Sequence, residues 1–271
     1  MIRELIRIFG RPKPNHKLEK TSHLWAILED FSTYKPTIST ENAVNIRGTI
    51  SIHFAADDER ARKVVRRSNY RMTGKHPSPL NGRMIHWESQ YEKEAFQLME
   101  ASPFVSAYRE QPAIFKYHNG DDVILTHFPD ILVTLTNGVQ VFVEVKPDRA
   151  KSDQQLLDRE KLIKQLLVTL GYGYIQIYPN QLEDFQYLKN AQYMLWQTKA
   201  PTPYSIKLLV QKFMNKKKKI KLGLLINHLN SLNARSWVFF LIMEGYITCD
   251  LSEKLVSSTF IMLNNKLGGV I

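Results

Sequence analysis

The stretch from His127 to Asp148 constrains the fold of this chain more than any other. Two apolar, β-branched runs flank the residues Thr136-Asn137-Gly138, which is a pattern that predicts a β-hairpin. A three-residue loop with Gly138 in the left-handed conformation would set Asp130 opposite Glu144. A two-residue turn at Asn137-Gly138 would instead set Asp130 opposite Val145, on the other face of the hairpin.

The hydrophobic pattern decides between these two registers. With a three-residue loop, one face of the hairpin is wholly apolar and holds the pairs Ile131/Val143, Val133/Val141 and Leu135/Val139. The other face then carries Thr134/Gln140, Leu132/Phe142, Asp130/Glu144 and Lys146. A slip of one residue would place Glu144 among the aliphatic side chains, so we expect the three-residue loop.

The polar face of this hairpin has a specific chemistry. Glu144 and Lys146 share it because residues two apart in a strand point the same way. Two carboxylates opposed across a ladder repel each other unless a cation lies between them, and hard oxygen ligands suit Mg²⁺ or Mn²⁺. A nearby lysine can orient an attacking water or balance developing charge. The pattern predicts phosphodiester hydrolysis. The alternative is a solvated hairpin face on which Lys146 pairs with Glu144.

Composition supports an anionic partner. The chain has 37 Lys and Arg against 26 Asp and Glu, which gives a formal net charge of +11; nucleic acid is the partner that such a balance favours. The single Cys249 excludes an internal disulfide framework and a cysteine-based zinc site. Without an apolar run of about 20 residues or an apolar signal core, we expect a cytoplasmic protein with no membrane segment.

A basic segment precedes the hairpin. Residues 60–83 contain eight Lys or Arg and no acidic residue. We expect this segment to be a phosphate-contacting arm, the alternatives being a solvated basic surface or a protein-docking segment. The candidate DNA-binding residues here are Arg62, Lys63, Arg66, Arg67, Arg71 and Lys75.

The remaining periodicities predict an α/β fold with a mixed sheet. Helical patterns cover residues 18–31, 84–101 and 152–170. Strand patterns cover residues 44–54, 105–108, 113–117, 123–125 and 174–178, with a turn at 118–122. His127 either contacts DNA or the site or, as we favour, is an ordinary packed or exposed histidine. The helix over 152–170 offers polar residues, Lys161 and Gln165 among them, without singling one out for the site.

The composition shifts after Pro179, so we expect a domain over 1–180 and a second over 181–271. Helices are predicted over 182–196, 206–213, 222–232 and 235–244, followed by a strand over 258–262. Three helices and a strand after the break at 198–203 suggest a winged-helix-like domain that docks a partner or DNA. Its basic run, Lys216, Lys217, Lys218 and Lys219, either contacts DNA or a partner or is a solvated turn.

The residues Pro129-Asp130 and Glu144-Val145-Lys146 resemble the PD-(D/E)XK nuclease motif. Over roughly Arg62 to Pro179, the chain resembles the N-terminal domain of TnsA-type endonuclease subunits of heteromeric cut-and-paste transposases. Two further stretches, R-M-I-H-W-E-S-Q-Y-E (83–92) and P-F-V-S-A-Y-R-E-Q-P (103–112), carry this resemblance. It implies a restriction-endonuclease-like core followed by a C-terminal domain that is similar to the TnsA family only in outline.

The resemblance also implies roles for residues and partners. In TnsA-type proteins a further acid lies where Glu92 stands in the S-x-x-E spacing, with Glu88 the second choice. Glu92, Asp130 and Glu144 would then bind Mg²⁺, for which Mn²⁺ substitutes, and Lys146 would complete the catalytic set. The implied partners are transposon-end DNA, a TnsB-like DDE transposase and a TnsC-like AAA+ ATPase, in a prokaryotic cytoplasm and nucleoid-associated when bound to DNA.

The expected activity is therefore strand cleavage at the 5′ ends of a mobile element, with the DDE transposase cutting the other strand. Two alternatives stay open. One is a free-standing PD-(D/E)XK nuclease of the resolvase or restriction type, which would act alone. The other is a non-catalytic DNA-binding adaptor, which would have no need of the acid-acid-lysine set. No nucleotide-binding, serine-hydrolase or zinc-protease motif occurs in the sequence.

Overall fold

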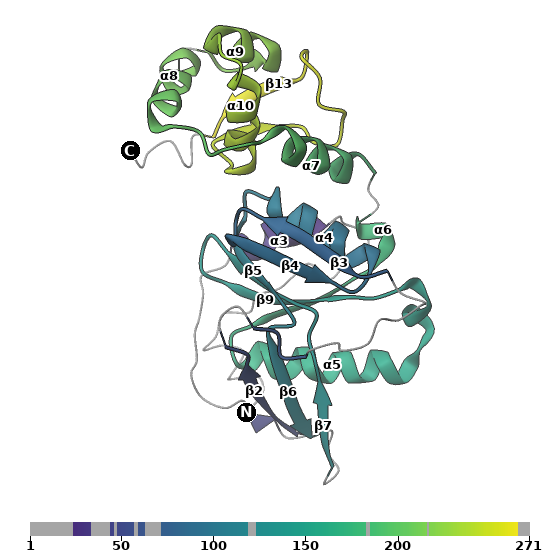
Figure 1. Cartoon of the computed structure of the whole chain (residues 1–271). Coiled ribbons are helices and arrows are strands. Elements are labelled where there is room, and N and C mark those ends of the chain that lie inside the picture. The colour runs from purple at the N-terminus through teal and green to yellow at the C-terminus, as the bar shows by residue number, and fades with distance from the viewer. Residues whose placement is uncertain are drawn as a thin grey trace. The chain divides into compact units, whose positions relative to one another are not determined.

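The structure, a computed structural model, describes residues 24–33, 44–45, 48–56, 59–62, 72–118, 123–182, 185–215 and 217–264. Within these residues the chain is a mixed α/β protein, as the sequence predicted (Figure 1). It divides into two compact units, Met1–Lys93 with Phe104–Leu182 and Glu94–Pro103 with Glu183–Ile271. Among the described helices, none combines the length and the apolar character that crossing a membrane requires.

The first unit is built on a mixed four-stranded sheet with the order β10-β9-β8-β5. Neighbours among β5, β8 and β9 are antiparallel, whereas β10 is parallel to β9. A parallel pair requires a crossover connection, which is supplied by a 3-10 turn and the helix α5. The elements are β5 (Val105–Glu110), β8 (Ile131–Leu135), β9 (Gln140–Val145), η1 (Asp148–Ser152), α5 (Gln154–Thr169) and β10 (Gly173–Ile177).

The hairpin of β8 and β9 has the predicted register. Ile131 pairs with Val143 and Val133 pairs with Val141. The loop has three residues, and Gly138 adopts a φ of 84°, in the left-handed region where a side chain is disfavoured. The amide of Gly138 donates to the carbonyl of Leu135 at 2.9 Å. The hydrophobic pattern therefore predicted this local geometry correctly.

A second, four-stranded sheet has the order β1-β2-β6-β7 and is antiparallel throughout. Its strands are β1 (Val44–Asn45), β2 (Gly48–Phe54), β6 (Ala113–His118) and β7 (Ile124–His127). The single strand predicted over 44–54 is thus wrong, because Val44 pairs with Thr49 across a reversal. The alternation of apolar and polar residues runs through both β1 and β2, so periodicity alone does not separate the two strands. Residues 119–122, the predicted turn, lie outside the described residues.

The helix α5 closes one core of the first unit against both sheets (Figure 1). Its buried residues Ile163, Leu166 and Leu167 pack with Phe115 of β6 and Phe142 of β9. The two phenylalanine rings meet edge to face, with centroids 4.8 Å apart. The polar face predicted for the hairpin is therefore covered by protein, which sets the environment of Glu144.

The other face of the main sheet is covered by the helix α3 (Leu24–Ser32). Phe31 approaches β10 so closely that a Cβ on Gly173 would lie 2.8 Å from its ring. The side chain of Asn137 donates to the carbonyls of Phe31 and Ser32, at 3.2 and 2.7 Å, which ties the hairpin loop to the end of α3. The sequence predicted a helix over 18–31, of which residues 18–23 lie outside the described residues.

The helix predicted over 84–101 is wrong in its first part. The hairpin of β3 (Gly74–Ser78) and β4 (Arg83–Trp87) comes first, and the helix α4 (Gln90–Glu100) follows. Buried Glu110 of β5 anchors this hairpin through a bidentate ion pair with Arg83, at 2.9 and 2.7 Å. The apolar residues in Met84–Trp87 fit the alternation of a strand as well as the period of a helix. The start of the helix is therefore marked only by Ser89.

The second unit has helices and a small sheet of its own. Its sheet is antiparallel, with the order β11-β13-β12. Buried Val238, Phe239 and Leu241 of α10 contribute to its core, together with Leu225 of α9 and Ile261 of β13. The elements are α6 (Pro179–Leu182), which belongs to the first unit, then α7 (Phe185–Gln197), α8 (Tyr204–Met214), β11 (Ile220–Lys221), α9 (Leu222–Leu229), α10 (Ala234–Met243), β12 (Ile247–Cys249) and β13 (Phe260–Leu263).

Candidate active site

Glu144 occupies the centre of a buried ionic cluster. It lies in β9 on the side that faces α5, and its side chain is 1% exposed. One carboxylate oxygen lies 2.6 Å from Nε2 of His127, and the other accepts from Nζ of Lys146 at 2.8 Å. Burial by itself raises the pKa of Glu144, but the hydrogen bond and charge of His127 and the charge of Lys146 outweigh it and lower the pKa. Glu144 is therefore held ionised inside the protein.

Lys146 follows β9 directly and points to the same side of the sheet as Glu144. Its Nζ also lies 3.5 Å from a carboxylate oxygen of Glu160 in α5. Burial lowers the pKa of Lys146, yet the carboxylates of Glu144, Glu160 and Asp130 reverse that effect and raise it overall. The alternative of a solvated hairpin face is wrong, because Glu144 is buried. The Lys146–Glu144 ion pair that this alternative predicted is nevertheless present.

Asp130 lies immediately before β8 and turns its carboxylate towards the neighbouring strand. Its Oδ2 accepts from the backbone amide of Val145 at 2.8 Å. Its carbonyl accepts from the amide of Gln111 at 2.7 Å, and Gln111 has a φ of 42°. Burial, together with the charges of Glu144 and Glu92, raises the pKa of Asp130 well above its usual range. The arrangement thus disfavours the ionised form of the Asp130 carboxyl.

Glu92 lies in the first turn of α4 and forms a capping box with Ser89. Its carboxylate accepts from the amide of Glu88 at 2.7 Å and from Oγ of Ser89 at 3.2 Å. Oγ of Ser89 in turn accepts from the amide of Glu92 at 3.1 Å. The S-x-x-E spacing therefore has a structural role in starting the helix. Glu92 also lies close enough to Asp130 to raise its pKa.

Glu88, the second choice for this role, is bound elsewhere. Its carboxylate accepts from the side-chain amide of Gln111 at 2.7 Å and lies 3.9 Å from Arg60. It thereby links the start of α4 to the strained backbone at Gln111, which supports Asp130. Glu88 is thus linked to Asp130 through Gln111.

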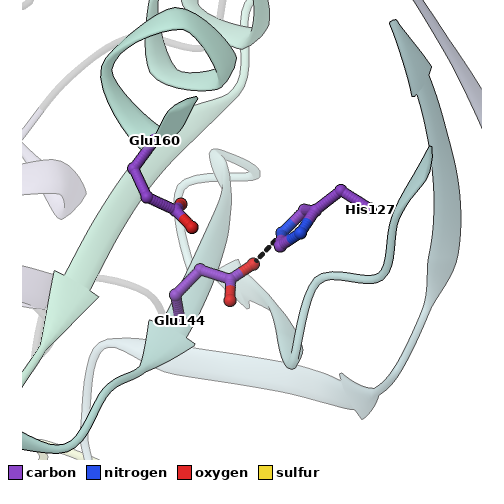
Figure 2. A group of neighbouring side chains, drawn as sticks. All are labelled: His127, Glu144 and Glu160. Carbon is purple, nitrogen blue, oxygen red and sulfur yellow. Dashed lines mark hydrogen bonds and ion pairs between the residues drawn. The ribbon is translucent and has the colours of Figure 1, made fainter. Parts of the chain in front are cut away.

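Two residues of the cluster were not assigned to the site from the sequence. His127, the last residue of β7, is buried and contacts Glu144 directly. Glu160 in α5 is 3% exposed, and one of its oxygens accepts from Arg159 at 2.7 Å. Figure 2 shows both side chains pointing towards Glu144. A signal for Glu160 was available, because it falls four residues after Leu156 and three before Ile163 on the apolar stripe of the helix.

The candidate DNA-binding residues are only partly described. Arg62 is exposed and lies over the ring of Phe128, 6.0 Å from its centroid, and Lys75 is exposed on β3. In the second unit Lys218 is exposed, and Lys217 and Lys219 lie over aromatic rings. The candidates outside the described residues are Lys63, Arg66, Arg67, Arg71 and Lys216.

The comparisons with known proteins assign no family to this chain. No family model matches the sequence. None of the curated proteins compared with it gives a match. The functional interpretation therefore depends on the residues and geometry described above.

Proposed function

We propose that this chain is a metal-dependent DNA endonuclease of the PD-(D/E)XK type, acting as a TnsA-like subunit of a transposase. The observation that carries the proposal is the grouping of Asp130, Glu144 and Lys146 at the adjoining ends of two strands. Asp130 is bonded to the strand that bears the other two, and Lys146 neutralises Glu144. The two carboxylates and the lysine that the motif requires therefore belong to one cluster.

The donor set fits a divalent cation. Burial raises the pKa of Asp130, and the repulsion of its carboxylate by Glu144 and Glu92 raises it further. Oε2 of Glu160 is buried and has no hydrogen-bond partner among the described residues. Both oxygens of Glu144 are engaged, but a carboxylate offers about four lone-pair sites, so further ligation is open to it. Asp130 and Glu144 would hold the cation, with Glu92 beside them.

Asp130, Glu144 and Lys146 would have different roles in hydrolysis. A bound divalent cation supplies Lewis-acid chemistry and lowers the pKa of water. Asp130 and Glu144 fix its position, because each is itself held by a neighbour: Val145 for Asp130 and His127 for Glu144. Lys146 stays charged and can balance the negative charge that develops on the phosphate.

The order of elements supports the nuclease core. A helix, antiparallel strands with a hairpin, a second helix and a parallel strand follow one another in α4, β5, β8, β9, α5 and β10. In the second unit the order α8, β11, α9, α10, β12, β13 supports a winged-helix-like module, for which we propose the ATPase or DNA as ligand. We propose a domain boundary near residue 180, where the last segment of the first compact unit ends at Leu182. The segment Glu94–Pro103, which holds most of α4, groups with the second compact unit and departs from a simple division at that residue.

The test is cleavage of supercoiled plasmid and of element-end DNA with Mg²⁺ or Mn²⁺. Asp130→Ala and Lys146→Ala are expected to reduce the cleavage rate at least about 1000-fold, because Asp130 would position the cation and Lys146 would balance charge on the phosphate. DNA affinity and the circular dichroism spectrum are expected to stay close to wild type.

Matched controls come from the exposed side of α5. Asp158→Ala and Lys161→Ala remove the same kinds of charge away from the cluster and are expected to cleave like wild type. Wild-type cleavage rates in both cluster variants would overturn the assignment of the site. Cleavage by the chain alone, without partner proteins, would favour the free-standing nuclease.

A further inference from the structure

A second group of possible ligand atoms includes Glu144 but not Asp130. Nε2 of His127 and one carboxylate oxygen each of Glu144 and Glu160 lie within 4.8 Å of one another. The three side chains come from β7, β9 and α5, and their exposed fractions are 8%, 1% and 3% (Figure 2). Three elements distant in sequence thus bring one imidazole and two carboxylates to a single buried point.

The hydrogen bonds of this group are incomplete. Oε1 of Glu160 accepts from Arg159, whereas Oε2 is buried and has no partner among the described residues. A buried carboxylate oxygen without a donor or a cation costs free energy. Figure 2 shows that the carboxylate of Glu160 points towards the other two side chains. The unpartnered oxygen is therefore an independent indication of a ligand at this point.

The donors also indicate which kind of ligand. One imidazole nitrogen with carboxylate oxygens suits first-row transition metals, whereas Mg²⁺ prefers oxygen ligands alone. The short contact of 2.6 Å between His127 and Glu144 is compatible with adjacent positions around one ion after a small side-chain adjustment. Lys146 is 14% exposed and Arg159 is 38% exposed, so two residues that contact the cluster reach solvent.

We propose that His127, Glu144 and Glu160 form a divalent-metal position that shares Glu144 with the Asp130 position. His127 makes this position selective for Mn²⁺ over Mg²⁺, because its nitrogen is a better ligand for Mn²⁺. A role of this metal position in DNA cleavage rests on the proposed function. Binding of the metal itself requires neither DNA nor partner proteins, so it can be measured separately.

The experiment adds Mn²⁺ alone to the full chain and records electron spin echo envelope modulation. Wild type is expected to show ¹⁴N coupling from a directly bound imidazole, which ¹⁵N-histidine labelling replaces by ¹⁵N coupling. His127→Gln is expected to abolish the ¹⁴N coupling and to weaken Mn²⁺ binding by roughly 10- to 100-fold, with less effect on Mg²⁺. Glu160→Gln is expected to weaken Mn²⁺ binding at least about 10-fold.

Two matched variants control for loss of a histidine and of an acid. His53→Gln on the exposed side of β2 and Asp158→Asn on α5 are expected to bind Mn²⁺ like wild type. Bound Mn²⁺ without histidine coupling in wild type would overturn this inference while leaving the nuclease proposal intact. Absence of Mn²⁺ binding would also overturn it, and the nuclease proposal would then be judged by cleavage. The isotope comparison in wild type decides the matter even if His127→Gln does not fold.

Discussion

The environment of Asp130 disfavours its ionised carboxylate when no cation is bound. Asp130 is half-buried, and desolvation together with the charges of Glu144 and Glu92 disfavours the ionised carboxylate and raises its pKa. In the absence of metal, the ionisation of Asp130 at neutral pH therefore costs stability. The cost disappears as the pH falls and the carboxyl becomes protonated.

Asp130→Asn is expected to raise the Tm of the metal-free protein. The amide keeps an acceptor for Val145 but carries no charge, so a gain of about 1 kcal/mol, or roughly 2–4 °C, follows at about pH 8. The gain is expected to shrink as the pH falls and wild-type Asp130 becomes protonated. Thermal unfolding with a chelator measures both values. A lower Tm at pH 8, with Asp158→Asn unchanged, would contradict this account.

At the residue scale, the sequence predicted part of the cluster. Asp130, Glu144 and Lys146 belong to one hairpin, so local alternation was enough to group them. Glu160 reaches them through the packing of α5 on the sheet, which local periodicity does not report. His127 belongs to β7, in a different sheet, and its contact with Glu144 depends on how the two sheets meet.

At the scale of elements, the hairpin of β8 and β9 determines which side chains enter the cluster. Its loop depends on Gly138, whose φ of 84° is costly for residues with a side chain. The register was predictable because a slip would exchange apolar and charged faces. The hairpin of β3 and β4 was not predictable, because the residues of β4 also fit the period of the helix that follows.

Gly138→Ala is expected to destabilise the protein by about 1–2 kcal/mol, because alanine disfavours the left-handed conformation. Gly138→Asn is expected to cost less, since asparagine tolerates that conformation. Both should keep the register, which the apolar face enforces, and hence the contact of Asp130 with Val145. Urea unfolding compares the three proteins. Equal stability of wild type and Gly138→Ala would show that the loop conformation is unimportant.

At the scale of the whole molecule, the first unit, for which we propose nuclease activity, is accompanied by a unit that bears its own sheet and basic residues. A chain that needs partners is expected to act only when they are present. A free-standing nuclease would not need them. The net charge of +11 favours DNA as a ligand without distinguishing these cases.

The measurement that tests the central claim most directly is strand-specific cleavage of end-labelled element DNA in Mg²⁺. Wild type and Asp130→Ala are each combined with the proposed partners, a DDE transposase and an AAA+ ATPase. The account predicts cuts at the 5′ ends that require both the partners and Asp130, while the DDE transposase still cuts the other strand with either protein. No 5′ cut by wild type in any combination, with DNA binding retained, would contradict it and favour a non-catalytic adaptor.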